Sequence, residues 1–164
     1  VKLDVPVTAI TRHFDSTSVC LSKGLGAPAG SLLCGTDELI NNAHRWRKML
    51  GGGMRQAGIL AAAGILSLTE HVRHLEQDHA NALQLAKKLA EIDGLEVDPG
   101  DVQTNMVLAG VAEASFQPLI EEMKNNGVLV FGRNNALRLV THFDFKKEDI
   151  DKVSTTFARV IATV

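Results

Sequence analysis

A lysine within a glycine-rich stretch is the first residue of this sequence that could perform chemistry. Residues 17–30 read TSVCLSKGLGAPAG, so Lys23 follows a short apolar run from Ser18 to Leu21. The short length, the β-branched residue and the glycine and proline residues that follow are typical of a buried strand. Open α/β sheets bind ligands beside the carboxyl ends of their strands, where glycines allow close approach to the backbone. We therefore expect Lys23 to face a ligand-binding crevice.

The residues alone leave three interpretations of Lys23 open. It could be a solvated lysine at the head of a turn, because most lysines are exposed. It could be a Schiff-base lysine, whose amine must be neutral to attack an aldehyde and therefore requires a desolvated or cation-rich pocket. A phosphate loop fits less well, because the glycines are spaced G-x-G-x-x-x-G and a second strand, Ser31 to Cys34, follows where a helix would be needed.

The second candidate is an anion site at residues 51–56, which read GGGMRQ. We predict that the three glycines end one helix and that Met54 to Gln56 begin another. The free N–H groups and positive dipole end of the new helix would then converge with the Arg55 guanidinium on an anion. A plain hinge is the alternative explanation of the glycines.

The third candidate lies in a predicted strand, Leu137 to His142. Side chains alternate between the two faces of a strand, so Arg138 and His142 share one face. An arginine in an apolar strand must bind an anion or reach water, and its planar fork favours a carboxylate. The carboxylate could belong to this chain or to a ligand, and His142 is given only a supporting role.

Alternating helices and strands must position these candidates. Thr36 or Asp37 can cap a helix that ends at the glycine triplet and carries basic residues in its last turn. Residues 55–93 contain no proline and carry one apolar stripe, which predicts a nearly continuous helix that Gly94 ends. This helix would connect two parts of the chain.

Three histidines fall on that predicted helix. His71, His74 and Asp78 would share a helix face, where a metal site is conceivable. No second cluster of ligands faces them, so we expect surface histidines and no metal. His79 falls on the apolar stripe, and we expect it in a core or an interface.

The remaining predicted elements are short and of mixed type. They are strands at 95–97, 105–111, 128–131 and 137–142, and helices at 116–126 and 148–161. Such a mixture is typical of a small α+β layer. We therefore divide the chain into residues 1–64 and residues 65–164, the second part beginning with the long helix.

Composition argues against several classes of partner. Charged residues are 22% of the chain and the net charge is −2, so bulk electrostatics suggest neither a nucleic-acid nor a membrane-surface partner. No apolar run approaches the ~20 residues of a membrane helix. Cys20 and Cys34 lie in apolar runs and are too few for a disulfide framework, which favours buried free thiols in a cytoplasmic protein. The sequence opens at Val1 without a signal-peptide pattern, and we expect that it starts within a longer protein.

Four stretches carry a resemblance to a known enzyme family. They are LSKGLGAPAGSLLCG at 21–35, RWRKMLGGGMRQAGILAAAG at 45–64, QTNMV at 103–107 and RLVTH at 138–142. Together they resemble the low-specificity L-threonine aldolases, pyridoxal-phosphate enzymes with the aspartate-aminotransferase-type fold. The resemblance covers only the carboxyl-terminal part of such an enzyme. It implies an α/β fold, in which the end of the cofactor-binding large domain, including the Schiff-base lysine, is followed by a small α+β domain.

The resemblance implies a role for each candidate residue. Lys23 would be the Schiff-base lysine of pyridoxal 5′-phosphate, and Arg138 would hold the α-carboxylate of the substrate. Arg55 would bind the cofactor phosphate of a neighbouring subunit, with Lys48 close to that site. The implied reaction is aldol cleavage of L-threonine or L-allo-threonine to glycine and an aldehyde.

The resemblance also implies partners. In the family, an aspartate at the pyridine nitrogen, a histidine stacked on the ring and a glycine-threonine phosphate loop come from the amino-terminal portion. We therefore expect this chain to need the missing amino-terminal half of its subunit and a homo-oligomer, a dimer of dimers (homotetramer). The alternatives are another pyridoxal-phosphate lyase, an aminotransferase, a phosphate site for some other nucleotide, or a non-catalytic assembly fragment.

Overall fold

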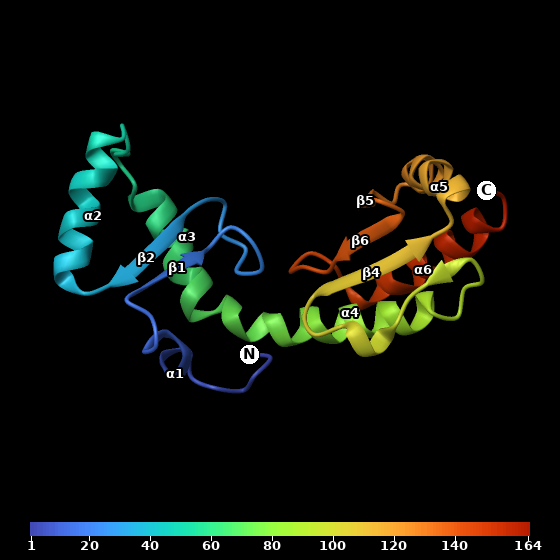
Figure 1. Cartoon of the computed structure of the whole chain (residues 1–164), viewed down its shortest axis with the longest axis horizontal. Helices are drawn as coiled ribbons and strands as arrows, with labels where there is room; N and C mark the ends of the chain where they lie inside the picture. Colours follow the sequence, from blue (N-terminus) through green and yellow to red (C-terminus); the bar gives the residue numbers. More distant parts are fainter. The chain divides into compact units, whose positions relative to one another are not determined.

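The computed structural model describes all 164 residues and divides them into two compact units. Unit 1 comprises Leu3–His74, and unit 2 comprises Leu75–Val164. Figure 1 labels the α-helices and most of the strands of both units. None of the helices combines the length and the apolar character that crossing a bilayer requires.

Unit 1 contains a two-stranded antiparallel hairpin and four helical segments. The elements are α1 (Val7–Thr11), β1 (Ser16–Cys20), β2 (Ser31–Gly35), α2 (Asp37–Met49), α3 (Gly58–Thr69) and the 3₁₀ helix η1 (His71–His74). Both strands predicted around Lys23 are present, and β1 begins two residues earlier than expected. The predicted burial is wrong for this chain, because no residue of β1 or β2 is buried and Cys34 is exposed. The Thr36 hydroxyl accepts a hydrogen bond from the backbone of α2, so the predicted cap of this helix is confirmed.

The long helix predicted over residues 55–93 is wrong in its middle. α3 ends at Thr69 and α4 begins at Leu75, with η1 between them. The hydroxyls of Ser67 and Thr69 donate to backbone carbonyls four residues earlier, and such bonds compete with the helix ladder and bend helices. No glycine or proline lies at this break, so the usual sequence signals of a helix end are missing.

Unit 2 is an antiparallel sheet with helices packed against one face. The elements are α4 (Leu75–Leu89), β3 (Leu95–Glu96), the 3₁₀ helix η2 (Pro99–Asp101), β4 (Met106–Val111), α5 (Glu113–Asn125), β5 (Phe131–Arg133), β6 (Ala136–Val140) and α6 (Lys147–Ile161). The strand order is β3-β4-β6-β5, and Figure 1 labels β4, β6 and β5 of this sheet. The small α+β layer predicted for this part is therefore present, although α4 ends at Leu89, well before Gly94.

The hairpin of β5 and β6 differs from the prediction in its first strand. β5 begins at Phe131, whereas the sequence predicts a strand at 128–131. Asn134 and Asn135 both have positive φ, 52° and 60°, and form a two-residue turn of the kind that matches the twist of a hairpin. This turn sets the register, so that Phe131 lies opposite Arg138.

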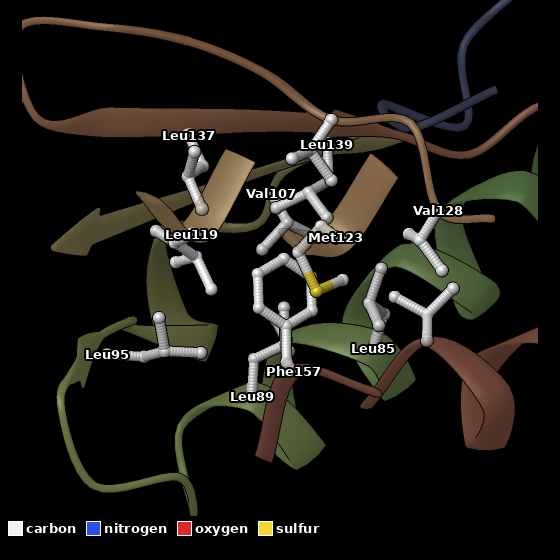
Figure 2. Close-up of a cluster of buried hydrophobic side chains, with 14 of the residues drawn as sticks. Leu85, Leu89, Leu95, Val107, Leu119, Met123, Val128, Leu137, Leu139 and Phe157 are labelled. Carbon is white, nitrogen blue, oxygen red and sulfur yellow. The ribbon is translucent and has the colours of Figure 1, made fainter. Parts of the chain in front are cut away.

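One buried hydrophobic cluster holds unit 2 together. Leu137 and Leu139 of β6 extend from the sheet toward Leu85 of α4 and Phe157 of α6 (Figure 2). Burying side chains of this size contributes about 1.5–3 kcal/mol each. Because residues 137 and 139 face the helices, the pleat directs Arg138 to the opposite face of the sheet.

Candidate functional site

Lys23 lies three residues beyond the end of β1, in a turn whose ends are buried. Its backbone carbonyl accepts a hydrogen bond from Gly26 N–H at 2.8 Å, and Ala27 N–H donates to the Leu21 carbonyl at 3.0 Å. Leu21 and Ala27 are both buried. The Lys23 side chain is exposed and forms no ion pair within the chain. Its amine is available to a ligand, and unit 1 does not surround it with the desolvated or cation-rich pocket that the Schiff-base interpretation requires.

The Cys20 thiol lies at the end of β1, close to this turn. Its Sγ atom is 3.5 Å from the Ser22 hydroxyl. Hydrogen bonding to Ser22 lowers the pKa of the Cys20 thiol, and the positive charge of Lys23 adds to the effect. The charge of Lys23 therefore acts on the thiol at the carboxyl end of β1.

The glycine triplet caps the carboxyl end of α2. Gly51 has φ +84°, and its N–H donates to the Lys48 carbonyl at 3.1 Å, while Gly52 N–H donates to the Arg47 carbonyl at 2.8 Å. This pair of bonds is the Schellman motif, which satisfies the last carbonyls of a helix. A Cβ at Gly52 would lie only 2.9 Å from the Arg47 carbonyl oxygen. These glycines therefore serve the end of a helix, and two of their N–H groups are already bonded.

The predicted helix start at 54–56 is wrong, because α3 begins at Gly58. Arg55 therefore precedes the helix and does not lie in its first turn. Arg55 and Lys48 are both exposed, and neither forms an ion pair within the chain. A Cβ at Gly53 would lie 3.3 Å from Lys48 Nζ, so the ammonium group lies over the end of the triplet. Any anion bound here would meet side-chain charge and not a helix terminus.

Arg138 lies on the outer face of β6 between two apolar neighbours. Leu108 of β4 is directly opposite it on one side and Phe131 of β5 on the other. These two side chains are 59% and 78% exposed. Arg138 forms no ion pair with any carboxylate of the chain, which rules out the internal salt bridge considered from the sequence. Its guanidinium therefore has both N–H edges available to an external anion.

His142 lines the same groove of unit 2 as Arg138, a hollow of about 430 Å³. Its Nδ1 accepts a hydrogen bond from the backbone N–H of Asp144 at 3.3 Å. The neutral imidazole therefore carries its proton on Nε2, where it is a hydrogen-bond donor. The predicted strand is too long, because β6 ends at Val140 and His142 lies beyond it, but Arg138 and His142 both line this groove.

The position of His79 agrees with the sequence prediction, whereas that of His71 does not. His71, which was expected on an exposed helix surface, has its Nδ1 2.7 Å from the carbonyl oxygen of Leu25 in the Lys23 turn. No local pattern could have predicted this contact, because the two residues are 46 positions apart. His79 is half-buried in α4, in line with its place on the apolar stripe, and burial lowers its pKa.

The candidate residues are divided between the units. Lys23, Lys48 and Arg55 belong to unit 1, and Arg138 and His142 belong to unit 2. No group of three or more histidine, cysteine, aspartate or glutamate side chains is arranged to hold a metal ion. The charged side chains of Lys23, Lys48 and Arg55 in unit 1, and of Arg138 in unit 2, suit a small anionic ligand instead.

Comparisons with known proteins agree with the earlier resemblance. The sequence profile of the β-eliminating lyase family matches residues 1–112. The low specificity L-threonine aldolase of Escherichia coli K12 is 46% identical over 153 residues, which are 93% of this chain and 45% of that protein. The low-specificity L-threonine aldolase 1 of Arabidopsis thaliana is 36% identical over 168 residues, which cover 100% of this chain and 47% of that protein. The chain thus spans about half the length of the curated relatives it matches.

Solved structures share the fold. A proposed L-allo-threonine aldolase from Listeria monocytogenes EGD-E gives a TM-score of 0.75 at 17% identity, covering 96% of this chain and 48% of that one. A proposed aromatic amino acid β-eliminating lyase/threonine aldolase from Exiguobacterium sp. 255-15 gives a TM-score of 0.76 at 18% identity, covering 97% of this chain and 48% of that one. These likenesses confirm the predicted fold class.

Proposed function

This chain belongs to the β-eliminating lyase family, and from that membership we propose that it supplies the lysine-bearing and carboxylate-binding part of a pyridoxal-phosphate-dependent threonine aldolase. The proposed reaction converts L-threonine or L-allo-threonine to glycine and an aldehyde. Relatives of 46% and 36% identity that are named L-threonine aldolases support this substrate class. We propose that the complete subunit contains this chain together with the half that its relatives carry in addition.

The observation that carries the proposal is the Lys23 amine. It projects from a glycine turn that backbone hydrogen bonds close, and it has no ion-pair partner in the chain. We propose that this amine, when neutral, forms the reversible covalent bond to the cofactor aldehyde. The bound cofactor would supply the electron sink for breaking the Cα–Cβ bond of the substrate.

Arg138 is proposed to bind the α-carboxylate of the substrate. Two parallel N–H···O bonds would fix the plane of the carboxylate and hence the orientation of the amino acid. Leu108 and Phe131 flank the arginine on the neighbouring strands. His142 Nε2–H supplies a further donor in the same groove.

Arg55, with Lys48 beside it, is proposed to bind the cofactor phosphate in a neighbouring copy of the subunit. Neither cation is neutralised by a carboxylate of its own chain. The large exposed apolar side chains near them are Trp46, Met49, Leu50 and Met54. Apolar patches of this kind mark interaction surfaces. We therefore propose a homo-oligomer, a dimer of dimers, in which this surface is covered by another subunit.

The proposed compartment is the cytosol. Cys20 and Cys34 are both free thiols. Free thiols are typical of reducing compartments, where disulfides are rare.

Reductive trapping in the complete subunit tests the proposal. After borohydride treatment with pyridoxal phosphate, peptide mass mapping should find the cofactor on Lys23. Lys23→Ala should abolish both this label and the release of glycine and acetaldehyde from L-threonine, whereas Lys124→Ala, at an exposed lysine of α5, should change neither. A label on another lysine, or glycine release by Lys23→Ala, would refute the assignment. A 2-oxo acid in place of acetaldehyde would overturn the aldolase reaction, and its release with ammonia would indicate β-elimination.

A further inference from the structure

We infer that His71 is a positioning residue for Lys23, because its imidazole N–H fixes the peptide group that closes the Lys23 turn. The inference rests on the proposed role of Lys23 as the amine that binds the cofactor. It concerns contacts within unit 1, between η1 and the segment that follows β1.

The Leu25–Gly26 peptide group is hydrogen-bonded at both of its ends. Its N–H, on Gly26, donates to the Lys23 carbonyl at 2.8 Å. Its carbonyl, on Leu25, accepts from His71 Nδ1 at 2.7 Å. A carbonyl can only accept, so Nδ1 carries the proton in this contact. Consecutive hydrogen bonds polarise one another, and His71 thereby strengthens the bond that closes the turn on the lysine itself.

The same helical segment contacts the turn at a second point. Leu21 packs so closely on Gly64 of α3 that a Cβ there would lie 3.0 Å from Leu21 Cδ1. Gly64 of α3 and His71 of η1 thus both contact the segment that follows β1. Lys23 therefore lies in sequence midway between Leu21, which packs on α3, and Leu25, whose carbonyl is bonded by η1.

The imidazole ring fits closely between its neighbours. Gly26 has φ +70°, and a Cβ at this position would touch His71 Nδ1 at 3.4 Å. On another side the ring meets His74 edge-on, with the ring centroids 5.9 Å apart and the planes at 71°. His71 is the first residue of η1, the 3₁₀ segment that follows the end of α3 at Thr69.

A lysine that repeatedly releases and re-forms a bond must return its amine to one point. A displacement of about 1 Å in a reacting group costs about 100-fold in rate. Without the His71 N–H, the Leu25–Gly26 peptide keeps only its bond to the Lys23 carbonyl, and we expect the Lys23 backbone to be held less firmly. The expected defect lies in the rate constant and not in substrate affinity, because Arg138 is the proposed substrate-binding group.

The test compares His71→Ala with His71→Asn in the complete holoenzyme. The asparagine amide can donate to the same carbonyl, and His13→Ala is the control for an exposed histidine elsewhere in unit 1. Deuterium uptake by the amides of residues 21–30 should be about tenfold faster in His71→Ala and close to wild type in His71→Asn. The kcat for L-threonine should fall about 10- to 100-fold in His71→Ala with KM changed by less than about twofold, and His71→Asn should recover much of it.

Unchanged deuterium uptake in His71→Ala would overturn the inference. Equal defects in His71→Ala and His71→Asn would also overturn it, because the N–H would then not be the cause. If His71→Ala does not fold, His71→Phe keeps a ring and removes the donor, and the same faster uptake is expected. If borohydride fixes no cofactor on Lys23 of the wild-type enzyme, the proposed function is refuted. Deuterium uptake by residues 21–30 would still show whether the His71 N–H stabilises the turn.

Discussion

Substitution of Arg138 should weaken substrate binding without destabilising unit 2. Its side chain is exposed on the outer face of β6 and forms no ion pair within the chain. Arg138→Lys and Arg138→Leu therefore remove no intramolecular salt bridge. We expect the free energy of unfolding to change by no more than about 0.5 kcal/mol, as for other surface substitutions.

The expected loss in binding follows from the shape of the guanidinium group. Arginine can hold a carboxylate by two parallel hydrogen bonds, whereas lysine offers a single point charge. One hydrogen bond to a charged group contributes about 1.5–3 kcal/mol. Because about 1.4 kcal/mol corresponds to a factor of ten, Arg138→Lys should raise the dissociation constant for the amino acid about 10- to 140-fold. Arg138→Leu, which also loses the charge, should bind more weakly still.

The assay measures KM for L-threonine, equilibrium binding of glycine and urea unfolding in the complete enzyme. Arg159→Lys is the matched control, because Arg159 is an exposed arginine of α6 that donates to Asn126 outside the groove. The control should leave KM and glycine binding unchanged. An Arg138→Lys enzyme with normal glycine binding, or one whose unfolding midpoint falls as far as that of a core variant, would contradict the reasoning.

Two further predictions concern the stability of unit 2. Leu137 is fully buried under the helices, so Leu137→Ala should lower the free energy of unfolding by about 2–5 kcal/mol in a urea titration, and a change below about 1 kcal/mol would contradict the packing described here. Burial holds the pKa of His79 below its ordinary value of about 6.5, so the unfolded chain binds this proton first as pH falls. The free energy of unfolding should therefore decrease as pH falls through and below that value, and His79→Gln should flatten this slope in titrations between about pH 5 and 8. An unchanged slope in His79→Gln would assign the pH dependence to other groups.

The parts of the fold that the sequence predicted well depend on local periodicity. Leu137 and Leu139 face the core and Arg138 faces outward, as the pleat of a strand requires. α6 was predictable because its apolar positions recur at helical spacing and its first turn is acidic. It begins at Lys147, one residue before the predicted start. Neither feature requires information from a distant part of the chain.

The glycine triplet shows why a local motif can be read in two ways. Glycine allows a positive φ at the carboxyl end of a helix and also opens the backbone before the next helix. The basic residues Arg47 and Lys48 favour the first reading, because positive charge is stabilised at a helix carboxyl end. A related signal was missed at Asn134-Asn135, whose residue types suit a two-residue hairpin turn and would have placed β5 correctly.

The Lys23 turn combines a local signal with a contact that no local signal reveals. The glycines that identify the lysine adjoin it in sequence, but the side chain that holds the turn comes from His71, after a helix end that lacks glycine and proline. Leu25 and His71 are 46 positions apart, so no local pattern in either segment indicates that they meet. A motif can therefore locate a candidate catalytic lysine, whereas the group proposed to position it comes from a distant segment and is found only in the folded structure.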